Sequence, residues 1–167
     1  MKLKLATASL AAILFSPALA WADPEYVTIR MEIDVAKSAT DTWAKVGDYY
    51  DIVEWFPNLT CRITSGDGGV GTVRAFDAAG KSTEVLTAKT DLSYGYTQPL
   101  KADKPYNLYH GFLEAKPLTA KTTRLIYTLM YDVSMLPDQA AKDADVTRRR
   151  AAFEGALGKM KAIAEAK

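Results

Sequence analysis

The sequence lacks several features that would assign it to a particular class of protein. It has one cysteine and one histidine among 167 residues, so it cannot form an internal disulfide and carries no recognisable zinc motif. Its 21 basic and 20 acidic residues leave a formal net charge of +1, which gives no basic excess for binding a phosphate backbone. We therefore expect no disulfide scaffold, no metal centre and no nucleic-acid partner.

The one long apolar run lies at the beginning of the chain. Two lysines precede the apolar segment at residues 5–15, and a proline and three small residues follow it. These are the parts of a secretory signal peptide, and the apolar core is too short to serve as a membrane anchor. We predict a signal peptide at residues 1–22, cleaved before Asp23 rather than at the alternative site before Trp21. A single domain at 23–167 would then be periplasmic or secreted, without stable membrane insertion.

The rest of the chain shows two periods of hydrophobicity. Alternating segments predict strands at 26–34, 59–64, 72–76, 81–89, 93–97, 106–115 and 124–133. Two short helices are predicted after the first strand, one ending at Gly47 and one over 51–56. From Asp138 onward, apolar residues recur at helical spacing, which predicts a helix of about 28 residues. This order is typical of an α+β domain in which a terminal helix covers one face of an antiparallel sheet.

Four short motifs in this order resemble the SRPBCC superfamily. They are Ala39–Asp48 (ATDTWAKVGD), Glu54–Pro57 (EWFP), Gly68–Arg74 (GGVGTVR) and Thr83–Thr87 (TEVLT). The resemblance spans residues 27–163 and implies the helix-grip fold of START lipid-transfer, pollen-allergen-like and polyketide cyclase/dehydrase proteins. In that fold a curved antiparallel sheet of about seven strands wraps around a long C-terminal helix, with two short helices after the first strand. The superfamily shares no single catalytic signature, so these motifs indicate fold rather than activity.

Such a fold encloses an apolar cavity, which is the default binding site. Side chains on one face of a strand can line it together, and we expect the His110 face of the strand at 106–115 to point inward. The predicted ligand-binding residues are Trp55, Phe56, Tyr94, Tyr96, Tyr106, Phe112 and Tyr131. Phenol rings combine stacking with hydrogen bonding, so this lining suits an aromatic or polyketide-like ligand. The alternative is that these are ordinary strand tyrosines, since tyrosine is favoured in strands.

Three side chains are the candidates for catalysis in this cavity. His110 could act as a general base near pH 7, and Glu54, beside Trp55, is the acid that we expect at the cavity mouth. Tyr127 would donate hydrogen bonds to the ligand. The alternatives are a structural histidine and a solvated helix carboxylate. The three arginines at 148–150 point about 100° apart on a helix, and we interpret them as a solvated face.

The resemblance implies two classes of function. The first is a cofactor-independent lyase of the polyketide cyclase/dehydrase type, which needs only an apolar cavity, a base and hydroxyl donors. The second is a non-catalytic periplasmic binder or carrier of a hydrophobic small molecule or lipid, with the loop at 98–105 as its lid. A partner-binding module with a collapsed cavity is a third possibility, but no long exposed apolar run supports it. The density of polar aromatic residues favours the enzyme, which we expect to be a monomer or a small homo-oligomer.

Overall fold

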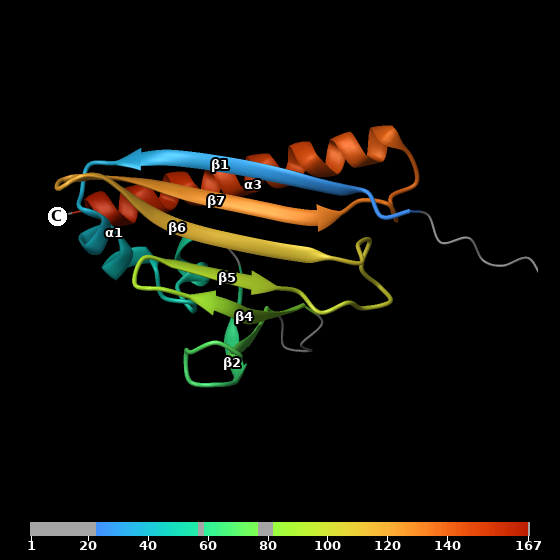
Figure 1. The fold of residues 1–167 in the computed structure, drawn as a ribbon, viewed down its shortest axis with the longest axis horizontal. Helices are drawn as coiled ribbons and strands as arrows, with labels where there is room; N and C mark the ends of the chain where they lie inside the picture. Colours follow the sequence, from blue (N-terminus) through green and yellow to red (C-terminus); the bar gives the residue numbers. More distant parts are fainter. Residues whose placement is uncertain (1–22, 57–58, 77–81, 167) are drawn as a thin grey trace, which may run out of the picture.

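The computed structural model describes residues 23–56, 59–76 and 82–166 (Figure 1). The elements are β1 (Tyr26–Val35), α1 (Ala39–Val46), α2 (Ile52–Trp55), β2 (Arg62–Ser65), β3 (Val73–Ala75), β4 (Thr83–Lys89), β5 (Ser93–Thr97), β6 (Tyr109–Thr119), β7 (Thr122–Asp132) and α3 (Gln139–Glu165). Within the described residues the sheet has seven strands in the order β1-β7-β6-β5-β4-β3-β2, all paired antiparallel. The predicted α+β helix-grip fold is confirmed. The predicted signal peptide lies outside the described residues.

The long helix α3 covers the inner face of the sheet. In Figure 1 it runs behind β1 and β7, with its C-terminal end beside α1. Asp138 caps its first turn by accepting a hydrogen bond from the backbone N–H of Ala141 at 2.8 Å. Its buried residues are Ala156, Leu157, Met160 and Ala164. These positions form one apolar stripe, and its burial against the sheet explains why a mostly polar sequence forms a helix here. None of the helices in the described ranges is long and apolar enough to cross a membrane.

Several strand boundaries differ from the sequence prediction. The strand β2 begins at Arg62 rather than at residue 59, and β6 covers Tyr109–Thr119 rather than 106–115. The strand β6 continues past Pro117 because its pairing with β7 is irregular between Pro117 and Thr119, and a bulge tolerates a residue without an N–H. The predicted start of β4 at residue 81 lies outside the described residues.

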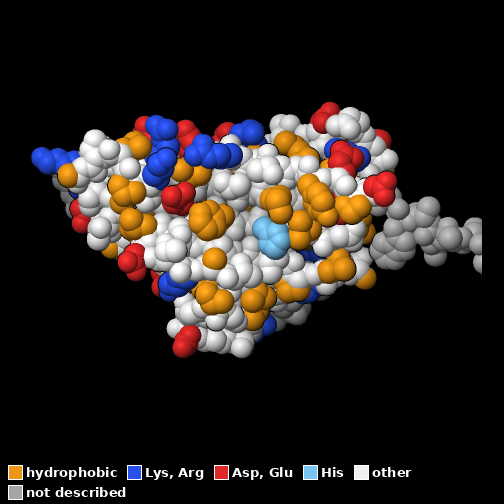
Figure 2. All heavy atoms as spheres, viewed as in Figure 1, with side chains coloured by type: hydrophobic (Ala, Val, Ile, Leu, Met, Phe, Trp, Pro, Cys, Tyr) orange, Lys and Arg blue, Asp and Glu red, His pale blue; other side chains and the backbone are white. Residues whose placement is uncertain are grey.

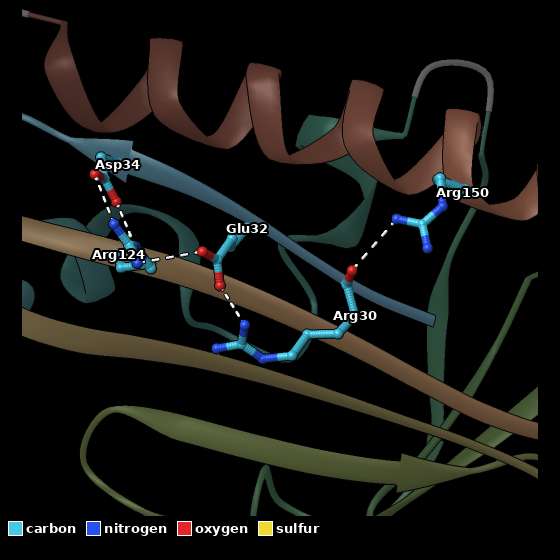
Figure 3. A network of polar contacts seen from close by, with 5 residues as sticks. All are labelled: Arg30, Glu32, Asp34, Arg124 and Arg150. Carbon is cyan, nitrogen blue, oxygen red and sulfur yellow. Dashed lines mark hydrogen bonds and ion pairs between the residues drawn. The ribbon is translucent and has the colours of Figure 1, made fainter. Parts of the chain in front are cut away.

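The outer edge of the sheet carries a network of exposed ion pairs (Figure 3). Arg124 of β7 donates from Nε to Asp34 of β1 at 2.6 Å and lies 3.2 Å from Glu32. Glu32 also pairs with Arg30, whose carbonyl accepts a hydrogen bond from Arg150 of α3 at 3.4 Å. Solvent screens such pairs, so they contribute little to stability. The network places Arg150 on the outside of the molecule.

Candidate functional site

A pocket of about 240 Å³ lies between the inner face of the sheet and the helices α2 and α3. Its lining residues are Ile52, Phe56, Leu59, Phe76, Glu84, Tyr96, Gln98, Tyr109, Arg148, Arg149, Ala152 and Phe153. A cavity of about 150 Å³ holds one benzene molecule, so this pocket has room for one or two aromatic rings. Apolar and aromatic side chains share the lining with one carboxylate, one amide, two phenols and two guanidinium groups, and polar groups of this kind fix the orientation of a ligand in small-molecule sites.

The acidic residue that lines the pocket, Glu84, belongs to a buried ion pair between neighbouring strands. Arg74 of β3 is fully buried and donates from Nε and Nη2 to Oε2 of Glu84, at 3.0 and 2.6 Å. Arg74 also donates to the backbone carbonyl of Tyr49. The other carboxylate oxygen of Glu84 accepts a hydrogen bond from the amide of Gln98 at 2.9 Å, and the Tyr106 hydroxyl donates to Gln98 in turn. Glu84 is therefore held in one orientation at the pocket wall.

Burial and the close contact between Arg74 and Glu84 shift the pKa values of both side chains. Burial raises the pKa of Glu84, although Arg74 and the hydrogen bond from Gln98 act in the opposite direction. Burial disfavours the charge on Arg74, but the adjacent carboxylate more than compensates and raises the pKa of Arg74 well above its usual value. A carboxyl that faces a pocket and has a raised pKa is a candidate for proton transfer to and from a bound ligand. Glu84 is thus suited to acid–base chemistry.

Two tyrosine hydroxyls form a second polar feature beside the pocket. Tyr96 of β5 lines the pocket, and its hydroxyl lies 2.9 Å from the hydroxyl of Tyr127 on β7. Burial raises the pKa of both phenols well above their usual value. Burial likewise raises the pKa of Tyr94, the neighbour of Tyr96 on the same face, to about 12. These phenols remain protonated at neutral pH, so they act as hydrogen-bond donors rather than as bases.

The opposite wall, on α3, carries two arginines. Three tyrosine rings surround the guanidinium group of Arg149, with centroids 4.5 to 5.6 Å from its central carbon. They belong to Tyr106, Tyr109 and Tyr131. Asp145, one helical turn earlier, accepts from Nε of Arg149 at 2.7 Å and also pairs with Arg148. Only 14% of the Arg149 side chain is exposed, against 66% for Arg148, so the prediction of a solvated arginine face is wrong for Arg149.

The tyrosines predicted to point inward are buried. Tyr94, Tyr96, Tyr127 and Tyr131 belong to the core, and Tyr106 joins them from the loop before β6. Of this set, Tyr96 lines the pocket. The predicted inward orientation is therefore observed, while the roles of these residues in ligand binding remain predictions.

The predicted orientation of β6 is wrong. Tyr109, Gly111 and Leu113 point inward, and His110 and Phe112 lie on the outer face. The chain's only histidine is visible on that face among hydrophobic side chains (pale blue in Figure 2), and 38% of Phe112 is exposed. A shift of one residue exchanges the two faces of a strand. His110 is therefore separated from the pocket by the sheet, and it cannot serve as the base there.

The predictions for the second short helix have mixed outcomes. Phe56, just after α2, lines the pocket as expected. Trp55 is fully buried in the core, with its ring 6.3 Å from that of Tyr127, and does not line the pocket. Glu54 is exposed and also lies outside the pocket lining. Because α2 is a single turn, its consecutive residues point in different directions. The carboxylate at the pocket is Glu84 instead.

Sequence reasoning missed the main polar residues of this site. The sequence pattern assigns Glu84 only to a fold motif, although Glu84 and the apolar Leu86, two residues later, share the buried face of β4. Arg74 likewise stands between two small apolar residues of β3. A charged residue on an apolar face is a signal, because burying a charge requires a partner. Among the described residues, no group of three His, Cys, Asp or Glu side chains could hold a metal ion.

Comparisons with known proteins agree with this architecture. The structure is similar to that of the Zhui aromatase/cyclase from Streptomyces, with a TM-score of 0.65 at 21% identity over 84% of this chain and 94% of that chain. It is also similar to norcoclaurine synthase from Thalictrum flavum, solved in complex with dopamine and hydroxybenzaldehyde. That match has a TM-score of 0.61 at 20% identity over 95% of this chain and 100% of that chain. These likenesses establish the fold alone.

No protein of curated function matches the sequence. A family model described as "Polyketide cyclase / dehydrase and lipid transport" matches residues 26–165. This range runs from the first residue of β1 to the last residue of α3. The chain therefore belongs to the polyketide cyclase/dehydrase and lipid transport family.

Proposed function

We propose that this protein binds an aromatic or polyketide-like small molecule and acts on it as a cofactor-independent lyase, by proton transfers that close a ring or eliminate water. The observation that carries the proposal is the buried carboxylate of Glu84 at the wall of a pocket with aromatic sides. Family membership supports it. So does the likeness to an aromatase/cyclase and to an enzyme solved with two aromatic compounds.

The pocket residues divide the chemistry between them. Glu84 takes a proton from the ligand and returns it, because its carboxylate lines the pocket and burial raises its pKa above the usual value. The Tyr96 hydroxyl, paired with Tyr127, donates a hydrogen bond to the oxygen on which negative charge develops. Phe56 and Phe153 hold the rings of the ligand, since both line the pocket and pack edge to face at 5.1 Å.

The test begins with native mass spectrometry of the mature protein after incubation with a small-molecule extract of its host. Bound compounds are identified by fragmentation, and the free pool is followed over time. A compound that disappears while a related product accumulates would establish an enzyme. Glu84→Gln should then slow conversion by about 10²–10⁴-fold, with its fold checked by circular dichroism. Glu154→Gln, an exposed change on α3 outside the pocket lining, should leave the rate unchanged.

The alternative function is a carrier of a hydrophobic small molecule or lipid. The family description includes lipid transport, and much of the pocket wall is apolar. Gln98, at the start of the loop that we predicted as a lid, contacts Glu84 and lines the pocket. A compound that is retained and then released unchanged would favour the carrier. Absence of any bound compound would contradict both functions.

We also propose that the protein is exported to the periplasm or secreted. The support is the lysine-flanked apolar segment followed by small residues within residues 1–22. The intact mass of the protein recovered from its host should correspond to a chain that begins at Asp23 or at Trp21. Recovery of the chain with residues 1–22 attached would contradict the proposal.

A further inference from the structure

The charges at the pocket do not cancel. Arg148 and Arg149 both line it, and both pair with the same carboxylate, that of Asp145. Glu84 is the only acidic residue among the described residues that line the pocket, and it is already paired with Arg74. One carboxylate therefore serves two guanidinium groups on the α3 wall. This leaves an excess positive charge at the edge of the pocket.

The two arginines differ in a way that suits ligand recognition. Arg149 is fixed, because Asp145 holds its Nε and three tyrosine rings surround its guanidinium group. Arg148 is mostly exposed, so it can move over the pocket opening when a ligand enters. A planar guanidinium group presents parallel N–H donors that match the two oxygens of a carboxylate. The partial exclusion of water strengthens such a contact.

From these observations we infer that the ligand of this pocket is an aromatic carboxylate, whose ring lies against Phe56 and Phe153 and whose carboxylate binds Arg148 and Arg149. The inference rests on the proposed function and adds a substrate class to it. It also gives the ligand an orientation. The anionic end faces α3, and the ring extends toward Glu84 and Tyr96, where proton transfer would take place.

The test compares two probes of nearly equal shape, 2-naphthoate and 2-naphthamide, by titration calorimetry on the mature protein. The carboxylate should bind about ten- to a hundredfold more tightly, the difference expected of a charge-assisted contact. Its advantage should shrink in Arg148→Gln, an exposed substitution that does not threaten the fold, and in Arg149→Gln. Arg149→Lys should keep part of the advantage because it keeps the charge.

Arg150→Gln is the matched control. Arg150 is the next residue of α3, but it lies outside the pocket lining, 3.6 Å from Glu154 and within hydrogen-bond distance of the Arg30 carbonyl (Figure 3). Its substitution should leave the affinity for both probes unchanged. A general electrostatic effect of a basic helix would instead lower naphthoate affinity equally in Arg148→Gln and Arg150→Gln, and that result would overturn the inference.

The two proposals fail in different ways. Equal affinities of the wild-type protein for 2-naphthoate and 2-naphthamide would overturn the carboxylate assignment and leave the proposed ligand-binding function standing. Absence of binding by either probe would overturn the carboxylate assignment and also count against an aromatic ligand in this pocket.

Discussion

Replacing Arg74 by methionine should leave a buried acid without its counter-charge. The side chains of Arg74 and Glu84 are 0% and 4% exposed, and two hydrogen bonds of 3.0 and 2.6 Å join them. Removing one partner of a buried ion pair costs about 3–5 kcal/mol. For a domain of this size each kcal/mol lowers the melting temperature by about 2–4 °C. We therefore expect the variant to melt about 6–20 °C below the wild-type protein.

The loss in Arg74→Met should depend on pH, because Glu84 can relieve its burial by protonation. Burial raises the pKa of Glu84 even with Arg74 present, and removal of the cation raises it further. The folded variant then keeps a proton that the unfolded chain loses above about pH 4.3. The free energy of unfolding of the variant therefore falls as pH rises from the pKa of Glu84 in the unfolded chain to its higher pKa in the folded variant, by up to about 1.4 kcal/mol per pH unit. The gap from the wild-type protein should therefore widen from pH 5 to pH 8.

Urea unfolding at several pH values, followed by the fluorescence of buried Trp55, measures this gap. The double variant Arg74→Met/Glu84→Gln should recover much of the loss, because no buried charge remains. As a control, Arg124→Met removes an exposed partner of Asp34 (Figure 3) and should change stability little at any pH. If Arg74→Met stays within about 1 kcal/mol of the wild-type protein at pH 8, or its deficit does not change with pH, the reasoning is refuted.

Three further predictions concern other parts of the sheet and α3. His110→Ala should leave the affinity for 2-naphthoate unchanged in calorimetry, because His110 lies on the outer face of the sheet; a tenfold loss would contradict the orientation of β6. Gly111→Ala should destabilise the fold by about 1–3 kcal/mol in thermal unfolding, because its Cβ would lie 2.2–2.4 Å from ring atoms of Tyr96. On α3, a Cβ added at Gly158 would meet no atom within 4 Å apart from its chain neighbours and the helix's own backbone. Gly158→Ala should therefore stabilise the fold by about 0.5–1 kcal/mol, and a loss of stability there would contradict this account.

The α+β order could be predicted from the two periods of hydrophobicity, and the helix-grip fold from the resemblance of four short motifs, whereas the inward face of β6 could not be predicted. The inner face presents Tyr109, Gly111 and Leu113, and the outer face presents His110 and Phe112. The two sets are too similar in hydrophobicity to indicate which of them faces the core. Glycine at 111 makes the inner face look weakly apolar, yet it is there because the ring of Tyr96 occupies the space of a side chain. That reason becomes visible only when the pairing of β5 with β6 is known.

The polar residues of the site escaped prediction for a related reason. Arg74 and Glu84 are direct partners in the register of β3 with β4, so each supplies the charge that permits the other to be buried. Before the register is known, each reads as an isolated charge that belongs in solvent. The pairing of residues from different strands is therefore the information that the sequence pattern lacks.

Arg149 is different, because its spacing from apolar residues in the sequence already indicates which face of the helix it lies on. It lies four residues before Phe153 and eight before Leu157, so all three fall on one face of α3. The buried residues of the helix confirm that this face points toward the sheet. Three consecutive arginines that point about 100° apart cannot all face solvent on a helix whose apolar stripe continues to this turn. The one directed inward must meet groups that accept a cation, and the tyrosines of β6 and β7 supply them. Charges that break an apolar pattern are therefore the better guide to this site than its single histidine.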